Sequence, residues 1–306
     1  MQAFVIGATG YIGGAVVDHL LEQGHDVVGL VRSSSSAHAL EEAGAKVHHG
    51  DIGRPSEWME QALQADAIVF AWLDPDMERF RTTDTAAVRA VLQNLKDSNK
   101  AFLYVTGSLG TGNTGPETEV DESTPADPPP FLAWRSELES EIRQAARTGV
   151  RTVVVRAPMV YGRTSGFIAE SLITDVSTTG RIHYVGDGDN LLAFVHVDDL
   201  AALCVRALAS APAGSLYLAS SGESLSSRDF SVMASSALGG DGGVVSLPVD
   251  VASAALGPFA EALTYSQRLS NARARQELGW KPTAHSVAEE LKLLRQRIPS
   301  KPHAQR

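Results

Sequence analysis

Residues 1–14 read MQAFVIGATGYIGG, and this stretch decides the fold class. A short apolar run at residues 3–6, predicted to be a strand, leads into Gly7, Gly10 and Gly13, and a helical run follows. Gly7 lets the chain turn sharply, Gly10 lets the backbone approach a pyrophosphate, and Gly13 lets the helix pack close to the strand. The first N–H groups and the positive dipole end of that helix would receive the anion. The stretch therefore predicts a phosphate-binding turn.

Strand-like and helical runs alternate through the first two thirds of the chain. Strands are predicted at residues 3–6, 26–31, 46–48, 67–71, 101–106 and 151–156, and helices at 11–23, 36–43, 55–64, 83–97 and 130–148. The runs at 67–71 (AIVFA) and 152–155 (TVVV) are apolar on both faces, which is typical of strands buried in a parallel sheet. The pattern predicts an α/β fold, a Rossmann-type doubly wound parallel sheet with a smaller C-terminal substrate-binding lobe.

The alternation ends after Pro158, where glycine and proline become more frequent. We expect a dinucleotide-binding domain at residues 1–161, to which residues 191–219 return as a strand and a helix. Residues 162–190 and 220–306 would then form the substrate-binding lobe and the C-terminal tail. Ligands of such sheets lie beyond the C-terminal ends of the strands, so a lobe at that edge predicts a substrate cleft.

The composition narrows the class of protein. The chain has 306 residues, of which 43% are hydrophobic and 20% charged, and its formal net charge is −10. This acidic balance argues against nucleic acid or an anionic membrane surface as a partner. The single cysteine, Cys204, excludes an internal disulfide framework, and no apolar run reaches the roughly 18 residues of a membrane span, so we expect a cytoplasmic protein. No metal site is expected, because the only adjacent histidines, His48 and His49, would alternate across a strand.

The end of the second predicted strand indicates which cofactor is bound. An NAD site usually has an acidic residue there to hold the ribose 2′-hydroxyl, but this chain has Arg32, followed by serines at 33–36. An arginine fork with serine hydroxyls suits a 2′-phosphate, so NADP is favoured over NAD. The alternative is an exposed arginine at a strand end. Asp51, after the third strand, could accept a hydrogen bond from the adenine amino group, or could cap a helix.

Several motifs in order resemble those of the extended short-chain dehydrogenase/reductase superfamily, the NAD(P)-dependent epimerases, dehydratases and reductases. They are the turn at 7–13, Gly50-Asp51, Ala71, YVTGS at 104–108, RAPMVYG at 156–162, FVHVDDLA at 194–201 and ELGWKP at 277–282. The resemblance covers nearly the whole chain and implies the following cofactor contacts: Gly7, Thr9, Gly10, Tyr11, Ile12, Gly13, Arg32, Asp51, Ile52, Ala71, Thr106, Arg135 and Pro158.

The chain departs from this family at the catalytic helix. Members use a serine or threonine with a Tyr-x-x-x-Lys pair, and here Ser108 matches the serine while Phe131 and Arg135 stand at the tyrosine and lysine positions. Phenylalanine carries no transferable proton and arginine is a fixed charge, although it can still bind ribose hydroxyls. The loss of a general acid or base typically costs 10² to 10⁴ in rate.

The catalytic candidates are therefore Ser108, to orient the substrate oxygen, Arg135, to bind the cofactor ribose, and Tyr161, as a proton donor. For Tyr161 a packed aromatic in a Val-Tyr-Gly turn is the favoured interpretation. Tyr104, His183 and Tyr184 are further candidates. His196 is expected to be structural, in a strand before a helix that Asp199 caps, and the Asp74-Pro75-Asp76 turn could contact a substrate or serve only as a turn.

The substrate is expected to be small and uncharged. Relatives that act on nucleotide sugars usually have a basic residue before the aromatic of the late strand, whereas residues 190–194 read NLLAF. Arg163 and Arg181 keep a sugar nucleotide open, and the segments 167–168 and 254–259 could wall an apolar pocket. We expect an atypical NADP(H)-dependent oxidoreductase acting on a carbonyl or alcohol. The alternatives are a cofactor-holding epimerase, dehydratase or cyclase, and a non-catalytic NADP(H)-sensing regulator. A homodimer through the helices at 83–97 and 130–148 is implied by analogy only.

Overall fold

The computed structural model describes residues 1–239 and 243–298 and contains a seven-stranded parallel sheet. The strand order is β11-β7-β5-β4-β1-β2-β3. The strands are β1 (Gln2–Ile6), β2 (Asp26–Val31), β3 (Lys46–His49), β4 (Ala67–Phe70), β5 (Ala101–Gly107), β7 (Arg151–Ala157) and β11 (Ser215–Leu218). The chain passes from β1 to β2 and β3 on one side and then crosses to β4 on the other side of β1, so the strand order reverses between β1 and β4. Ligands of such sheets bind at this point. The Rossmann-type prediction is confirmed.

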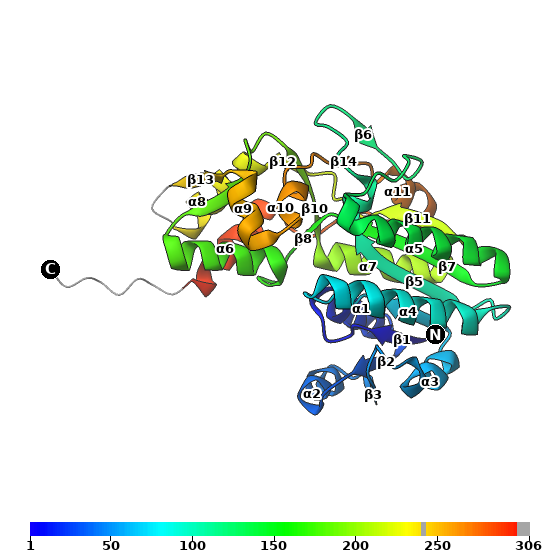
Figure 1. Cartoon of the computed structure of the whole chain (residues 1–306). Coiled ribbons are helices and arrows are strands. Elements are labelled where there is room, and N and C mark those ends of the chain that lie inside the picture. Colours follow the sequence, from blue (N-terminus) through cyan, green and yellow to red (C-terminus); the bar gives the residue numbers. More distant parts are fainter. Residues whose placement is uncertain (240–242, 299–306) are drawn as a thin grey trace.

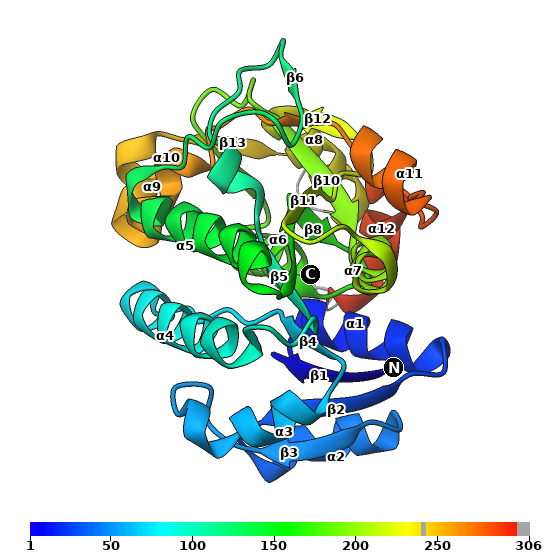
Figure 2. The ribbon, with the colours of Figure 1, turned by 90° about the vertical axis from the view of Figure 1, so that its right-hand side faces the viewer.

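Helices cover both faces of the sheet, as Figure 2 shows for α4 and α5 on one side and α1 and α7 on the other. These helices are α1 (Tyr11–Glu22), α2 (Ser34–Glu42), α3 (Met59–Gln64), α4 (Met77–Leu95), α5 (Ala133–Gln144) and α7 (Val197–Ser210). Alternate residues of a strand point to opposite faces, so Phe4 packs with the α3, α4 and α5 side while Val5 packs with α1 and α7. Both side chains are fully buried.

The C-terminal lobe lies beside the sheet, to the left in Figure 1. Its helices are α6 (Gly166–Thr179), α8 (Ser227–Leu238), α9 (Val249–Leu256), α10 (Phe259–Ala262) and α12 (Val287–Leu294). Its strands are β8 (Met159–Tyr161), β9 (Ile182–Val185), β10 (Leu191–His196), β12 (Ser224–Ser226) and β13 (Val244–Leu247). Two short strands, β6 (Glu119–Val120) and β14 (Arg268–Leu269), pair with each other. The lobe has its own core, in which Phe194 and Phe230 pack with α6, α8 and α12.

The segment 191–219 returns to the main sheet only in part. α7 and β11 do so, but the strand β10 pairs with β8 and β12 in a separate three-stranded sheet. This strand therefore lies outside the main sheet, although its Val195 packs in the core of the main domain. The helix α11 (Ala272–Leu278) also packs on the main domain, and the Trp280 indole donates to the Asp199 carbonyl at 2.9 Å.

Two helices start at residues other than those expected. α4 begins at Met77 instead of near residue 83, because the Asp76 carboxylate accepts hydrogen bonds from the N–H groups of Glu78 and Arg79. α7 begins at Val197 with His196 as its N-cap, so the prediction that Asp199 caps this helix is wrong. Asp199 instead accepts from the Thr283 N–H at 2.8 Å and holds the C-terminal segment.

Within the ranges 1–239 and 243–298, no helix combines the length and the apolar character that crossing a membrane requires.

Candidate functional site

The glycine turn has a geometry that other residues could not adopt. Gly7 has a φ of +86°, and a Cβ there would lie 2.4 Å from the Ala71 carbonyl oxygen. At Gly13 a Cβ would lie 2.0 Å from the Gly7 carbonyl oxygen, so α1 packs directly on the end of β1. The Gly10 N–H donates to the Gly7 carbonyl at 2.9 Å and closes the turn. Since Gly10 caps α1 without a side chain, the start of this helix is open to an anion.

Tyr11 fixes this turn to the segment after β8. Its hydroxyl donates to the Gly162 carbonyl at 2.9 Å, and its ring lies where a Cβ of Gly166 would stand, 2.5 Å from that position. Burial raises the pKa of Tyr11 above its ordinary value. Tyr11 therefore joins the dinucleotide-binding domain to the first turn of α6.

A polar groove of about 430 Å³ extends from the glycine turn across the ends of β2, β3 and β4. It is lined by the predicted residues Gly7, Thr9, Arg32, Asp51 and Ile52, and also by Ser33 and Ser36. Asp51 is partly engaged, because its Oδ1 accepts from the Gly53 N–H at 2.8 Å. The structure therefore brings together the residues expected at the adenosine end of a dinucleotide.

Arg79, in the first turn of α4, is a second arginine in this groove, and no motif in the sequence points to it. Its guanidinium makes two hydrogen bonds to the Asp74 carboxylate, at 2.7 and 2.6 Å, and lowers the pKa of that carboxyl. Asp74 therefore belongs to this end of the groove, and Asp76 caps α4. The turn that contains both residues has a local structural role.

The groove continues on the other side of Gly7 as a cavity of about 570 Å³. It is lined by the predicted residues Gly7, Thr9, Gly10, Tyr11, Ile12, Ala71 and Pro158, together with Trp72, Leu73, Met159, Val160, Gly166, Phe167 and Ile168. This end lies at the boundary between the sheet and α6. It is where the second half of a dinucleotide and the reacting part of a substrate would meet.

Thr106, predicted to contact the cofactor, is placed elsewhere. It is buried and its hydroxyl donates to Glu139 at 3.2 Å. Glu139 in turn forms a buried ion pair with Arg156 at 2.7 Å. Thr106 and Arg135 do not line either part of the groove.

Ser108 is engaged by a glutamine from the far end of the chain. Its buried hydroxyl donates to Gln267 Oε1 at 2.6 Å, and Gln267 Nε2 donates to the carbonyls of Ser108 and Gly112 at 2.9 and 3.0 Å. The proton of Ser108 is thus already donated within the protein. No spacing in the sequence pointed to Gln267.

Arg135 belongs to a buried polar network below the groove. Its Nε donates to the Tyr104 hydroxyl at 3.0 Å and its Nη2 to the Val105 carbonyl at 3.3 Å, while its guanidinium lies 4.8 Å from the centre of the Phe80 ring. Tyr104 donates to Asp84 at 2.5 Å. Burial raises the pKa of Asp84 to about 6, partly offset by the Arg135 charge. Arg135 therefore compensates a buried carboxyl and connects α4, β5 and α5.

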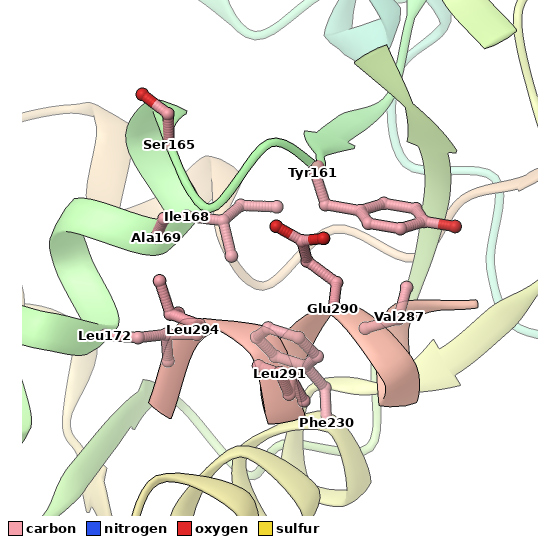
Figure 3. A pocket seen from close by; sticks show the side chains of 11 residues that line it. Tyr161, Ser165, Ile168, Ala169, Leu172, Phe230, Val287, Glu290, Leu291 and Leu294 are labelled. Atoms are coloured by element: carbon pink, nitrogen blue, oxygen red, sulfur yellow. The ribbon is translucent and has the colours of Figure 1, made fainter. Parts of the chain in front are cut away.

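Phe131, at the family's tyrosine position, and the candidate Tyr161 also have internal partners. Phe131 packs edge-to-face against Phe259, with ring centroids 5.9 Å apart. The Tyr161 hydroxyl donates to the His285 carbonyl at 2.8 Å, and Figure 3 shows it directed away from α6. Tyr161 borders a cavity of only about 20 Å³, beside Glu290, and does not line the groove. This geometry favours the packed-aromatic interpretation of Tyr161.

One cluster of possible metal ligands forms only in three dimensions. His196, His285 and Glu290 each place one ligand atom within 4.8 Å of the others. His285 Nε2 lies 2.6 Å from Glu290 Oε2, a direct hydrogen bond. His196 is buried, its Nδ1 accepts from the Asp198 N–H, and Gly162 packs against its Nε2. Burial lowers the pKa of His196. Its burial and its hydrogen bond at the start of α7 support the structural role expected for His196.

The lobe contains an apolar cavity of about 460 Å³. Its walls include the predicted segments Phe167–Ile168 and Ala255–Leu256, and its polar members are Ser171, Asp175, His183, Tyr184, Ser227 and Ser231. Met159, Phe167 and Ile168 line both this cavity and the groove, so the two spaces adjoin. Among the described lining residues there is no lysine or arginine.

Arg163 and Arg181, the arginines that would favour a nucleotide sugar as substrate, do not line this cavity. Arg163 forms ion pairs with Asp18 and Asp198, each at 2.6 Å, and Arg181 is exposed. Asn190 is the first residue of the stretch 190–194, which has no basic residue for a diphosphate. Its side chain donates to the carbonyls of Leu263 and Tyr265. The cavity thus offers no cation to a diphosphate.

The residues present fit a dinucleotide. The positions of Gly7 and Gly13 leave no room for side chains, the start of α1 is open, and two continuous spaces extend from it in opposite directions. Gly7, Gly10 and the first turn of α1 would hold the pyrophosphate, and Arg32 and Asp51 lie at the adenosine end.

Comparison with known proteins agrees with this geometry. The dTDP-glucose 4,6-dehydratase of Streptomyces venezuelae, solved with NAD bound, has the same fold, with a TM-score of 0.81 and 23% identity over 97% of this chain and 96% of that one. A ketoreductase of Stigmatella aurantiaca, for 4-hydroxy-2-methyl-3-oxo-4-farnesyl-3,4-dihydroquinoline-1-oxide, is 26% identical over 265 residues, 83% of this chain and 78% of that protein. An uncharacterised protein of Schizosaccharomyces pombe is 30% identical over 298 residues, 95% of this chain and 98% of that one. Residues 3–219 match the model of the NAD dependent epimerase/dehydratase family, and the chain therefore belongs to this family.

Proposed function

We propose that the protein is an NADP(H)-dependent oxidoreductase that reduces a carbonyl group of a small, neutral, largely apolar molecule, or oxidises the corresponding alcohol. One observation carries the proposal: the groove at the glycine turn adjoins an apolar cavity through Met159, Phe167 and Ile168. A carbonyl at this junction would lie beside the cofactor while the rest of the molecule fills the cavity. The similarity to a ketoreductase whose substrate carries a farnesyl chain supports an apolar substrate.

The preference for NADP rests on the end of β2. Arg32, Ser33 and Ser36 line the groove together, and a guanidinium with hydroxyl groups suits a phosphate on the ribose. Arg79 adds a second guanidinium on the opposite wall, although Asp74 already accepts two of its hydrogen bonds.

The chemistry of reduction needs a hydride and a proton. A bound nicotinamide supplies the hydride. At this end of the groove the described side chains with polar hydrogens are those of Thr9, Tyr11 and Trp72, and the Tyr11 proton is already donated to Gly162. The proton on the product oxygen would therefore come from water, and the protein would contribute position and exclusion of competing orientations.

A second candidate function is the binding of NADP(H) as a signal without turnover. It is favoured by the internal partners of Ser108, Phe131 and Arg135, which fill the corner where the family's acid–base pair would stand. Such a protein would bind the cofactor with the affinity of an enzyme and oxidise no NADPH with any carbonyl compound.

The test is NADPH oxidation, followed by absorbance, over a panel of neutral ketones and aldehydes of increasing apolar size. We expect turnover that favours apolar ketones and NADPH over NADH. If the protein binds NADPH but none of the panel is reduced, the oxidoreductase proposal fails and the sensor remains.

Cofactor preference is tested separately with Arg32→Ala. We expect a 10- to 100-fold loss of NADPH affinity and little change for NADH, because about 1.5–3 kcal/mol is lost with a charge-assisted hydrogen bond. Arg81→Ala is the matched control, since Arg81 is an exposed arginine of α4 that pairs with Glu78 and does not line the groove. Equal losses for both cofactors would contradict the assignment of Arg32.

A further inference from the structure

One face of α6 forms a wall of the apolar cavity along most of the helix. Phe167, Ser171 and Asp175 line the cavity at four-residue intervals, with Ile168 and Leu172 beside them. Residues at this interval lie on the same side of a helix. Because Phe167 and Ile168 also line the groove, the cavity begins at the cofactor site and continues along α6 toward Asp175.

Asp175 marks the far end of this wall. It lies eight residues beyond Phe167, which corresponds to about 12 Å along a helix axis. There it meets His183 of β9, the other titratable side chain with a partner in the cavity. The distance from the junction with the groove to this pair therefore matches the length of a small elongated molecule.

Asp175 contacts the histidine at its backbone and at its ring. One carboxylate oxygen accepts from the His183 backbone N–H at 2.8 Å, and the other lies 3.1 Å from Nδ1 of the ring. β9 itself pairs in parallel with β13, which holds the backbone in place. Because Nδ1 lies beside a carboxylate, Nε2 is the ring nitrogen left for a ligand. Within the described part of the chain, no hydrogen bond to Nε2 is formed.

Two other side chains of the cavity, Ser231 and Tyr184, have contacts within the protein. The Ser231 hydroxyl donates to the Ser227 carbonyl at 2.8 Å, and the Tyr184 ring packs against the turn at Gly188. The remaining described walls are mostly aliphatic and aromatic, and they carry no cation. A polar contact in such surroundings discriminates between ligands, because a ligand without the matching group leaves it unpaired.

We propose that the substrate is an elongated neutral molecule that carries a hydroxyl group at the end opposite the reacting carbonyl, and that His183 Nε2 accepts a hydrogen bond from this hydroxyl. The proposal rests on the proposed function, because it uses the same cavity as the substrate site. Asp175 acts as a positioning residue that holds the imidazole in place.

The experiment compares two ketones that differ in one group, 4-phenylbutan-2-one and 4-(4-hydroxyphenyl)butan-2-one. Their affinities are measured by isothermal titration calorimetry on the full chain saturated with NADP⁺, which cannot reduce them. We expect the hydroxylated ketone to bind about fivefold more tightly, which corresponds to about 1 kcal/mol for one neutral hydrogen bond. His183→Phe should bind both ketones equally.

Tyr265→Phe is the matched control, because it removes a hydroxyl from a residue of the same lobe that does not line the cavity, and it should keep the preference. The Tm and the NADP⁺ affinity of each variant show whether it is folded. The proposal is overturned if the wild-type protein does not discriminate, if His183→Phe keeps the preference, or if Tyr265→Phe loses it. Tighter binding of the 4-carboxyphenyl analogue than of either ketone would also overturn it, since an anion would require a charged imidazolium.

NADPH oxidation by the same two ketones separates this proposal from the proposed function. Discrimination in binding without any oxidation means that the oxidoreductase proposal fails while the ligand assignment holds. Reduction of both ketones without discrimination in binding means that the ligand assignment fails while the oxidoreductase proposal holds.

Discussion

Two regions at the same edge of the sheet differ in how they are built. The cofactor cradle, Gly7 to Gly13 between β1 and α1, is formed by the backbone and by glycines at positions where a side chain would not fit. The catalytic corner, here Ser108, Phe131 and Arg135 at the end of β5 and the start of α5, is made of side chains that already have partners in the protein. The cradle is left open for a ligand, whereas the corner is filled from within.

The difference shows that the two regions depend on different parts of the chain, the cradle on backbone geometry and the corner on side chains. A cradle that depends on φ angles and close backbone packing tolerates almost no substitution. In a corner that depends on side chains, a side chain can take a structural role instead. Arg135 does so by donating to Tyr104, which in turn donates to Asp84. The family's fold is therefore present with a different distribution of functional groups.

The largest effect is expected from breaking the cradle with Gly13→Ala. The new Cβ would lie 2.0 Å from the Gly7 carbonyl oxygen, so α1 must move away from β1. We expect a loss of about 3 kcal/mol in the free energy of unfolding and a roughly 100-fold loss of NADPH affinity, measured by denaturation and fluorescence titration.

Gly14→Ala is the control, because a Cβ there would meet its nearest neighbour, the Ala8 carbonyl oxygen, at 3.5 Å, an ordinary contact. It should be as stable as the wild type or slightly more so. If the two variants behaved alike, the close packing at Gly13 would not be what the cradle requires.

The next effect concerns the buried carboxyl below the corner. The folded-state pKa of Asp84, about 6, is above its ordinary value of 3.8, so between these values the folded chain holds a proton that the unfolded chain has lost. The contribution of Asp84 to the free energy of unfolding therefore rises as the pH falls from about 6 to about 4, by about 3 kcal/mol in total. Asp84→Asn should lack this dependence. Denaturation curves at several pH values check it, and parallel profiles for the two proteins would contradict it.

A smaller effect is expected from Ser108→Ala. The variant removes the hydrogen bond to Gln267 Oε1 and should lower the free energy of unfolding by about 1 kcal/mol. Turnover with NADPH and a ketone should fall less than tenfold, because the Ser108 proton is not available to the substrate. A 100-fold loss of kcat at unchanged stability would mean that Ser108 contacts the substrate after all.

The smallest effect is expected from Phe131→Tyr. The variant restores a tyrosine at the family's position, but Arg135, held by Tyr104 and the Val105 carbonyl, cannot act as the lysine would. We expect kcat to change by less than about threefold in the NADPH assay, against the 10² to 10⁴ that a working acid–base group contributes. A gain in that range would show that the corner keeps its catalytic capacity.

Much of the fold and of the cradle could be predicted because both depend on local patterns. Strand–helix alternation, apolar strands and the glycine spacing each act over a few residues, and the residues lining the groove at Arg32 and Asp51 follow directly from strand ends. The true start of α4 differs from the expected one because the Asp74-Pro75-Asp76 segment fits a turn as well as a helix cap. The partners of β10 cannot be predicted, because a strand's own sequence does not encode its pairing.

The Rossmann-type sheet, the phosphate-binding turn and the absence of a Tyr-x-x-x-Lys pair can be read from short segments of the chain. Only the tertiary structure decided that Gln267 holds Ser108, that Asp84 and Tyr104 hold Arg135, and that α6 aligns Phe167 with Asp175 and His183 along one cavity. Such contacts join residues far apart in the chain. Their existence depends on how whole elements pack, because a side chain's partner is set by the geometry of the fold and not by its neighbours in sequence.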